Sequence, residues 1–435
     1  MTEGNIVWHI LAYAVPMIFG NILQLTYNAV DSIIIGKCLG EGSLAAVSSA
    51  NPVMTIMILG ASGMGVGGSV LISRFYGASK MEKVKREFST IVIFGVFFSL
   101  IIFLLGAILS GPILRAMHTP EEIMDLAQLY LRIILVGFLF SFQFNMISSA
   151  MRGMGDSSTP VFFLGISCVI NVLLDLLLVA GLHMGVAGAG LATCFAEAIS
   201  VICCVVYIYR KEPALSLRKH EWQLDRGLLK ETLAIGSLSA LQGAAQPIGK
   251  VIIQSVINAR GIVAIGAFNA VCRLDDFACI PTQSIGSAIM TCTAQNRGAG
   301  NEERVKASLS QGLKVNLGYF PIICSLTLLF RYPFMRLLTP KGSTEMIAMG
   351  AAYLAVKAWF FLLPCITNSI QGFFRGVAKM NIVLLCTVIQ ISIRTVLVSI
   401  LVPKIGITGE AYACLIGWVT MAVFEYTYYF YYRRK

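Results

Sequence analysis

The stretch "RFYGASKMEKVKRE", residues 74–87, recurs later in the chain as "QNRGAGNEERVKAS", residues 295–308. The two stretches align at an offset of 221 positions, which superimposes Gly77 on Gly298, Ala78 on Ala299, Val84 on Val305 and Lys85 on Lys306. Two further pairs keep nearly the same register: "GVAGAGLA" from Gly185 matches "GITGEAYA" from Gly406 at 221, and "MRGMGD" matches "FRGVAK" at 223. Three matches in one register predict that the chain consists of two homologous halves.

The composition is that of a membrane protein. Of the 435 residues, 57% are hydrophobic and 13% are charged, against roughly 25% charged residues in soluble domains, and the mean hydropathy is +0.78. Apolar windows of about 20 residues, each long enough to cross a hydrocarbon layer about 30 Å thick, recur along the whole chain. They predict twelve spans, at residues 8–36, 46–75, 88–113, 122–150, 160–180, 185–209, 228–258, 261–292, 308–332, 346–374, 381–402 and 406–431.

The twelve spans fall into two groups of six on either side of a polar segment. Because each repeat holds an even number of spans, the halves have the same orientation and are related by a pseudo-two-fold axis along the membrane normal. We expect an all-α integral membrane protein with an N-lobe at 1–209, a cytoplasmic linker at 210–227 and a C-lobe at 228–435. Two similar bundles around a central cleft are typical of transporters.

The basic residues predict the orientation of the chain. With the N-terminus inside, the inner loops carry about three times as many Lys and Arg residues as the outer loops, as expected for cytoplasmic loops. Both termini are therefore expected in the cytoplasm. The formal net charge of +11 is explained by basic loops that meet anionic lipid, so no nucleic-acid partner is expected.

Four polar residues share one depth in the predicted N-lobe. Asn171 and Asp175 lie four positions apart in the apolar stretch "SCVINVLLDLLLVAGL", residues 167–182, and so share one face of the fifth span. Asp31 in the first span and Thr193 in the sixth lie at a similar distance from the outer surface, about 9 Å by the helical rise for Asp175. Carboxylate, amide and hydroxyl oxygens are suitable ligands for a proton or a small hard cation. An unpaired carboxylate in lipid costs several kcal/mol, which favours a bound ion as the partner of the two aspartates. Helix–helix hydrogen bonding is the alternative role of Asn171 and Thr193.

The predicted C-lobe carries basic residues where a cation site would need carboxylates. Lys250 lies within the seventh span and can pair with Asp275 or Asp276 of "CRLDDFACIP", for which Arg273 competes. These four residues form a candidate polar cluster, with a purely structural Arg273–Asp275 pair as the alternative. Lys357 in the tenth span is expected to snorkel to the outer interface. We therefore expect no cation site in this lobe.

The remaining residues give no sign of catalysis. The four His lie near span ends or in loops without metal-ligand spacing, and the sequence contains no nucleophile or nucleotide-binding motif. The twelve Cys also lack metal-ligand spacing and are interpreted as small packing residues. We therefore expect neither an intramembrane enzyme nor a resident cofactor.

An ordered set of motifs resembles the multidrug and toxic compound extrusion (MATE) family: "YNAVDSIIIG", "GASKMEKVKRE", "MRGMGDSSTP", "NVLLD" and "GVAGAGLAT", with "RLDDFACIPTQSIGSA" and "AQNRGAGN" in the second half. This family is part of the multidrug/oligosaccharidyl-lipid/polysaccharide flippase superfamily. The resemblance implies Na⁺ or H⁺ antiport of organic cations and drugs across a bacterial cytoplasmic membrane by alternating access of two lobes. It also assigns cation coupling to Asp31, Asn171, Asp175 and Thr193, with Na⁺ on the two aspartates in a sodium-coupled protein.

Two further expectations accompany the resemblance. Pro16 weakens the backbone hydrogen bonding of the first span and is a candidate hinge for bending during transport. The alternative function is a flippase for lipid-linked saccharides, which predicts extra spans or a cationic lumen. Twelve spans and the pair Asp31 and Asp175 favour the exporter, which we expect to act as a monomer.

Overall fold

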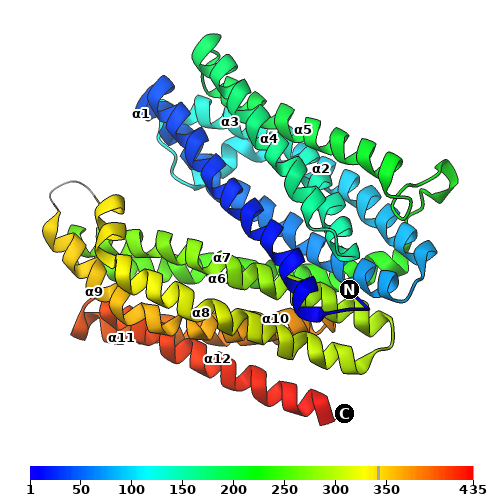
Figure 1. Cartoon of the computed structure of the whole chain (residues 1–435). Helices are drawn as coiled ribbons and strands as arrows, with labels where there is room; N and C mark the ends of the chain where they lie inside the picture. Colours follow the sequence, from blue (N-terminus) through cyan, green and yellow to red (C-terminus); the bar gives the residue numbers. More distant parts are fainter. Residues whose placement is uncertain (340–342, 435) are drawn as a thin grey trace. The chain divides into compact units, whose positions relative to one another are not determined.

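The computed structural model describes residues 1–339 and 343–434, and all regular secondary structure in these ranges is helical (Figure 1). Lys341 and Lys435, which contribute to the predicted loop charges, lie outside the described residues. The helices are α1 (Ile6–Gly77), α2 (Met81–Ala116), α3 (Glu121–Met154), α4 (Ser158–Asp175), η1 (Leu176–Gly181), α5 (Gly185–Lys211), η2 (Lys219–Glu221), α6 (Arg226–Asn258), α7 (Ile262–Gly298), α8 (Glu302–Leu338), α9 (Thr344–Phe360), α10 (Leu362–Gly376), α11 (Met380–Ile405) and α12 (Thr408–Arg434).

All twelve predicted spans correspond to helical segments, which confirms the fold class. The first two spans both lie in α1, which Gly40 divides by a left-handed backbone angle of φ 80°. The fifth span continues from α4 into the π-helix η1, and the tenth consists of α9 and α10, which meet at a bend of 46°. Neither the π-helix nor the bend is apparent in the hydrophobic pattern.

The helices differ in how apolar they are. Among the described residues, seven helices are long and apolar enough to cross a membrane by themselves, or eight if the bent pair α9 and α10 is counted as one span. The helices α6, α7 and α12 are long enough but less apolar. Ionic side chains that α7 and α12 direct into the protein contribute to this difference.

The contacts within the chain define two compact units. The N-unit consists of Pro16–Ala240, and the C-unit consists of Met1–Val15 together with Leu241–Lys435. The chain passes from one unit to the other inside α1, directly before Pro16, and inside α6, directly after Ala240. By its contacts, the segment 210–227 belongs to the N-unit. The predicted division into two membrane lobes joined by a cytoplasmic linker stays a prediction.

Each unit contains the same close helix crossing, at positions that the sequence repeat relates. In the N-unit, α3 approaches α1 so closely that a Cβ atom on Gly153 would lie 2.8 Å from the carbonyl oxygen of Ser69. In the C-unit, α10 approaches α7 so closely that a Cβ atom on Gly376 would lie 2.6 Å from the carbonyl oxygen of Met290. Only a residue without a side chain allows such an approach, as is typical of helix contacts in membranes. The structure thereby confirms the repeat.

The segment after α5 is bound to the first turns of α2 within the N-unit. Lys85 Nζ lies 2.9 Å from Glu221 Oε1, and Ser89 Oγ exchanges two hydrogen bonds with the backbone of Gln223, at 2.8 and 2.9 Å. The backbone N–H of Asp225 donates to Thr90 Oγ1 at 3.1 Å. These contacts fix residues 221–225 against α2.

Candidate functional site

The N-unit brings the two predicted aspartates together. Asp31 from α1 and Asp175 from α4 lie with their carboxyl groups in hydrogen-bonding contact. Asp175 is fully buried, and each carboxyl group keeps one buried oxygen, Oδ1, without a hydrogen-bond partner among the described residues. Two ionised carboxylates in contact repel each other strongly in a medium of low dielectric constant. The geometry therefore suits a proton or a cation shared between them.

Asn171 links this pair to α5. Its buried amide lies between Asp175 and Thr193, and the orientation that satisfies both of its ends has Nδ2 donating to Asp175 Oδ2 at 2.9 Å. In this orientation Oδ1 accepts from the backbone N–H of Thr193 at 3.1 Å. The structure thus brings together all four residues of the predicted N-lobe site, and their role in coupling stays a prediction.

The backbone around Asp175 is irregular. Asp175 is the last residue of α4 and directly precedes the π-helix Leu176–Gly181. Single π-helical turns interrupt the regular backbone hydrogen bonding and occur frequently at functional sites. The sequence gives no sign of this turn, because "DLLLVAG" is compatible with an ordinary apolar helix.

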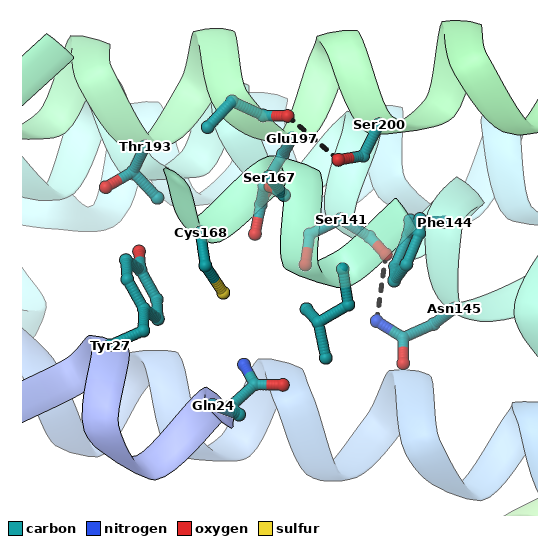
Figure 2. Close-up of a pocket in the computed structure, with 12 residues that line it drawn as sticks. Gln24, Tyr27, Ser141, Phe144, Asn145, Ser167, Cys168, Thr193, Glu197 and Ser200 are labelled. Carbon is teal, nitrogen blue, oxygen red and sulfur yellow. Dashed lines mark hydrogen bonds between the residues drawn. The ribbon is translucent and has the colours of Figure 1, made fainter. Parts of the chain in front are cut away.

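A polar cavity of about 90 Å³ lies beside these residues in the N-unit (Figure 2). Its main polar wall comes from α1, α3, α4 and α5, through Gln24, Tyr27, Ser141, Asn145, Ser167, Thr193, Glu197 and Ser200. The Tyr27 hydroxyl is in hydrogen-bonding contact with Thr193, and the Glu197 carboxyl group is in contact with Ser141. Thr193 therefore belongs both to this cavity and to the group around Asp175.

Glu197 is the residue that the sequence interpretation missed. It is the only acidic residue in the predicted span 185–209 and follows Thr193 by four positions, so it shares that residue's helix face. An ionisable residue inside an apolar span is a functional candidate by default. This signal was sufficient to identify it.

A second, more apolar cavity of about 60 Å³ adjoins the first. Ser141, Thr193 and Glu197 line both cavities, so the two share one wall. The rest of the second cavity is formed by Met54, Met57, Ile58, Ile134, Gly137 and Phe138. Among the described residues, neither cavity is lined by Lys, Arg or His, so the carboxyl group of Glu197 meets no basic side chain from this part of the chain there.

The C-unit does not gather the four predicted polar residues into one cluster. Lys250 Nζ pairs with Asp276 Oδ1 at 2.8 Å, and both side chains are about half exposed. Arg273 is exposed and forms no ion pair with either aspartate in the described part of the chain. The reason is helical geometry, since adjacent residues such as Asp275 and Asp276 point about 100° apart around α7.

The expectation that Lys357 snorkels to the outer interface is wrong. Its side chain is 1% exposed and pairs with Asp275 inside the C-unit. Glu410 lies 3.9 Å from the same ammonium, and it also accepts hydrogen bonds from Arg394 and from the Tyr353 hydroxyl. Two basic and two acidic side chains thus neutralise one another between α7, α9, α11 and α12. This pairing explains how Lys357 is accommodated without reaching the surface.

The described residues contain no group of three or more His, Cys, Asp or Glu side chains that could hold a metal ion. This finding does not bear on Asp31, Asn171, Asp175 and Thr193 as a site for an alkali cation. Such a cation is bound by carboxylate, amide and hydroxyl oxygens together, and amide and hydroxyl groups are not among these four residue types.

Two homologous helical units and a polar site buried among apolar helices are the architecture of a multi-pass membrane transporter. The MatE family profile matches residues 16–177 and again residues 239–400, so each half of the chain carries one copy. The chain belongs to the MatE family. Members of this family are plasma-membrane transporters for small molecules, and they use an ion gradient without a prosthetic group.

Individual relatives agree with the family assignment. The chain is 27% identical over 391 residues to a protein of Bacillus subtilis named "Probable multidrug resistance protein YpnP", covering 89% of this chain and 86% of the relative. It is 28% identical over 365 residues to YoeA of the same organism, with coverages of 82% and 78%. An outward-facing multidrug resistance MATE family transporter has the same fold, with a TM-score of 0.91 at 23% identity over 98% of this chain and 96% of that one.

Proposed function

We propose that this protein exports organic cations and drugs in exchange for Na⁺ or H⁺, with Asp31, Asn171, Asp175 and Thr193 as the coupling site. The observation that carries the proposal is the contact between the carboxyl groups of Asp31 and Asp175. The names of the relatives YpnP and YoeA as multidrug resistance proteins support the kind of substrate.

The contact supplies a physical link between ion binding and conformation. When both carboxylates are ionised they repel each other, and a proton or Na⁺ between them relieves this repulsion. The bound ion therefore favours the packing of α1 against α4 in which the two groups touch. A ligand shifts the equilibrium between the two packings only by the difference in its affinity for them. A substrate that binds the ion-free packing more tightly is therefore released when the ion binds and favours the other packing.

The similarity to multidrug resistance proteins does not favour the alternative function, a saccharide flippase.

Three finer points belong to the proposal: the transporter acts as a monomer, Pro16 is the hinge of α1, and both termini face the cytoplasm. The coupling residues come from one unit of a single chain, which supports the monomer. The junction between the two units directly before Pro16 supports the hinge.

Reconstituted protein tests the proposal. Proteoliposomes loaded with ethidium, a fluorescent organic cation, should release it when an inward Na⁺ or H⁺ gradient is imposed, and Asp175→Asn and Asp31→Asn should each reduce this release at least tenfold. The matched control is Asp125→Asn, which changes an exposed carboxylate of α3 and should leave the rate unchanged. Normal gradient-driven release by the Asp31→Asn, Asp175→Asn double variant would overturn the proposal.

The orientation has its own test. A cysteine introduced at the exposed residue Lys219 should react with a membrane-impermeant maleimide in inside-out vesicles and not in intact cells, relative to the parent chain. Reaction in intact cells would reverse the proposed topology.

A further inference from the structure

The two adjoining cavities of the N-unit combine a single carboxylate with an apolar pocket. Glu197 and Ser141 lie in the shared wall, with hydroxyl and amide groups on one side and the side chains of Met54, Met57 and Phe138 on the other. Glu197 is half-buried, and its carboxyl group contacts the Ser141 hydroxyl. A carboxylate in such a place attracts a positive charge, since low-dielectric walls strengthen its field.

We propose that Glu197 holds the ammonium group of an amphipathic organic cation, whose apolar part lies against Met54, Met57 and Phe138. This inference rests on the proposed function and identifies how its substrate is bound. It adds a carboxylate separate from the aspartate pair, so that ion and substrate have different charged partners in the same unit.

The shape of the site favours an organic cation over a bare Na⁺. A small inorganic cation requires several oxygen ligands converging at a short distance. The more apolar cavity presents thioether, aliphatic and aromatic groups instead. These groups suit the hydrocarbon part of an organic cation, and an aromatic ring such as that of Phe138 attracts a positive charge to its face.

Thr193 connects the substrate site to the coupling site. Its backbone N–H donates to Asn171, which donates to Asp175, while its side chain contacts Tyr27 on the cavity wall. A shift of α5 that accompanies ion binding therefore changes the position of Glu197, one helical turn further on. The two ligands are thus expected to weaken each other's binding without touching the same carboxylate.

Direct binding to purified full-length protein tests the assignment. Benzyltrimethylammonium, measured by isothermal titration calorimetry, should bind the native chain, and Glu197→Gln should weaken its binding at least tenfold. Met54→Ala should weaken it less, through loss of apolar contact, and Asp125→Asn should have no effect. Unchanged binding of benzyltrimethylammonium by Glu197→Gln would overturn the inference.

A second measurement separates this inference from the proposed function and from misfolding. The Glu197→Gln variant should keep the native thermal unfolding temperature, and it should bind ²²Na⁺, or take up protons when the pH is lowered, as the native chain does. Loss of that ion response together with ammonium binding would show that Glu197 belongs to the ion site, and would overturn the inference. If instead Glu197→Gln alone loses ammonium binding while the double aspartate variant transports normally, the substrate site stands and the proposed coupling site fails.

Discussion

Asp31 of α1 and Asp175 of α4 are 144 positions apart in the sequence, yet their carboxyl groups touch inside the N-unit. In the proposed mechanism the two groups share one proton or ion, so removing the charge of either should disable the same step. We therefore predict that Asp31→Asn and Asp175→Asn are not additive: the double variant should transport ethidium no more slowly than the slower single variant. Initial rates of gradient-driven efflux test this, and multiplied effects would mean that the residues act independently.

Substitutions of Asn171 and of Thr193 should weaken ion coupling by different amounts. Asn171→Ala removes the hydrogen bond from the amide to Asp175 Oδ2, and a hydrogen bond to a charged group contributes about 1.5–3 kcal/mol. We expect the driving-ion concentration for half-maximal transport to rise roughly tenfold or more. Thr193→Val keeps the backbone N–H that reaches Asn171 and should have a smaller effect. Equal effects of the two variants would show that the Thr193 hydroxyl contributes as much as the Asn171 amide and would contradict this ranking.

Much of this architecture could be predicted from the sequence, because it depends on local patterns. Apolar runs mark the helices, and the repeat around Gly77 and Gly298 marks the two halves. Asn171 and Asp175 share a face through helical spacing alone. The partner of Lys357 could not be predicted in this way, since it depends on the rotation of α9 relative to α7 and α12. Hydropathy gives the length of a helix but not which neighbour each of its faces meets.

Lys357 and Asp275 of the C-unit form an ion pair, and removing one partner should destabilise the fold more than removing both. Lys357→Met leaves Asp275, whose side chain is 18% exposed, without its partner inside the C-unit, which should lower the free energy of unfolding by about 3–5 kcal/mol. Adding Asp275→Asn should restore part of the loss. The control is Lys250→Met, whose pair with Asp276 is about half exposed and should contribute about 1 kcal/mol or less. Chemical unfolding in detergent measures all three, and equal losses at Lys250 and Lys357 would contradict the argument from burial.

The repeated helix crossing should tolerate no side chain in either unit. Gly153→Ala and Gly376→Ala each place a Cβ atom closer than 3 Å to a carbonyl oxygen, so the helices must move apart. Such overpacking costs about 1–3 kcal/mol of stability. Gly318→Ala in α8 is the control, because a Cβ atom there meets nothing within 4 Å and alanine is the better helix former. An equal loss at Gly318 would show that the effect is not one of packing.

The attachment of residues 221–225 to α2 should weaken in acid. The backbone N–H of Arg218 and the ammonium of Lys85 hold the pKa of the Glu221 carboxyl group below its usual value of 4.5. Since the pKa is depressed in the folded state, the stabilisation is complete above pH 4.5 and is lost as the pH falls through the folded pKa. Hydrogen exchange of the backbone of residues 221–225 should therefore accelerate, relative to its intrinsic rate, below about pH 4. Lys85→Met should produce a similar loss of protection at neutral pH, and Lys80→Met, an exposed lysine directly before α2, should not. Protection that stays constant from pH 7 to pH 3 would show that Ser89 and Thr90 hold the segment without Glu221.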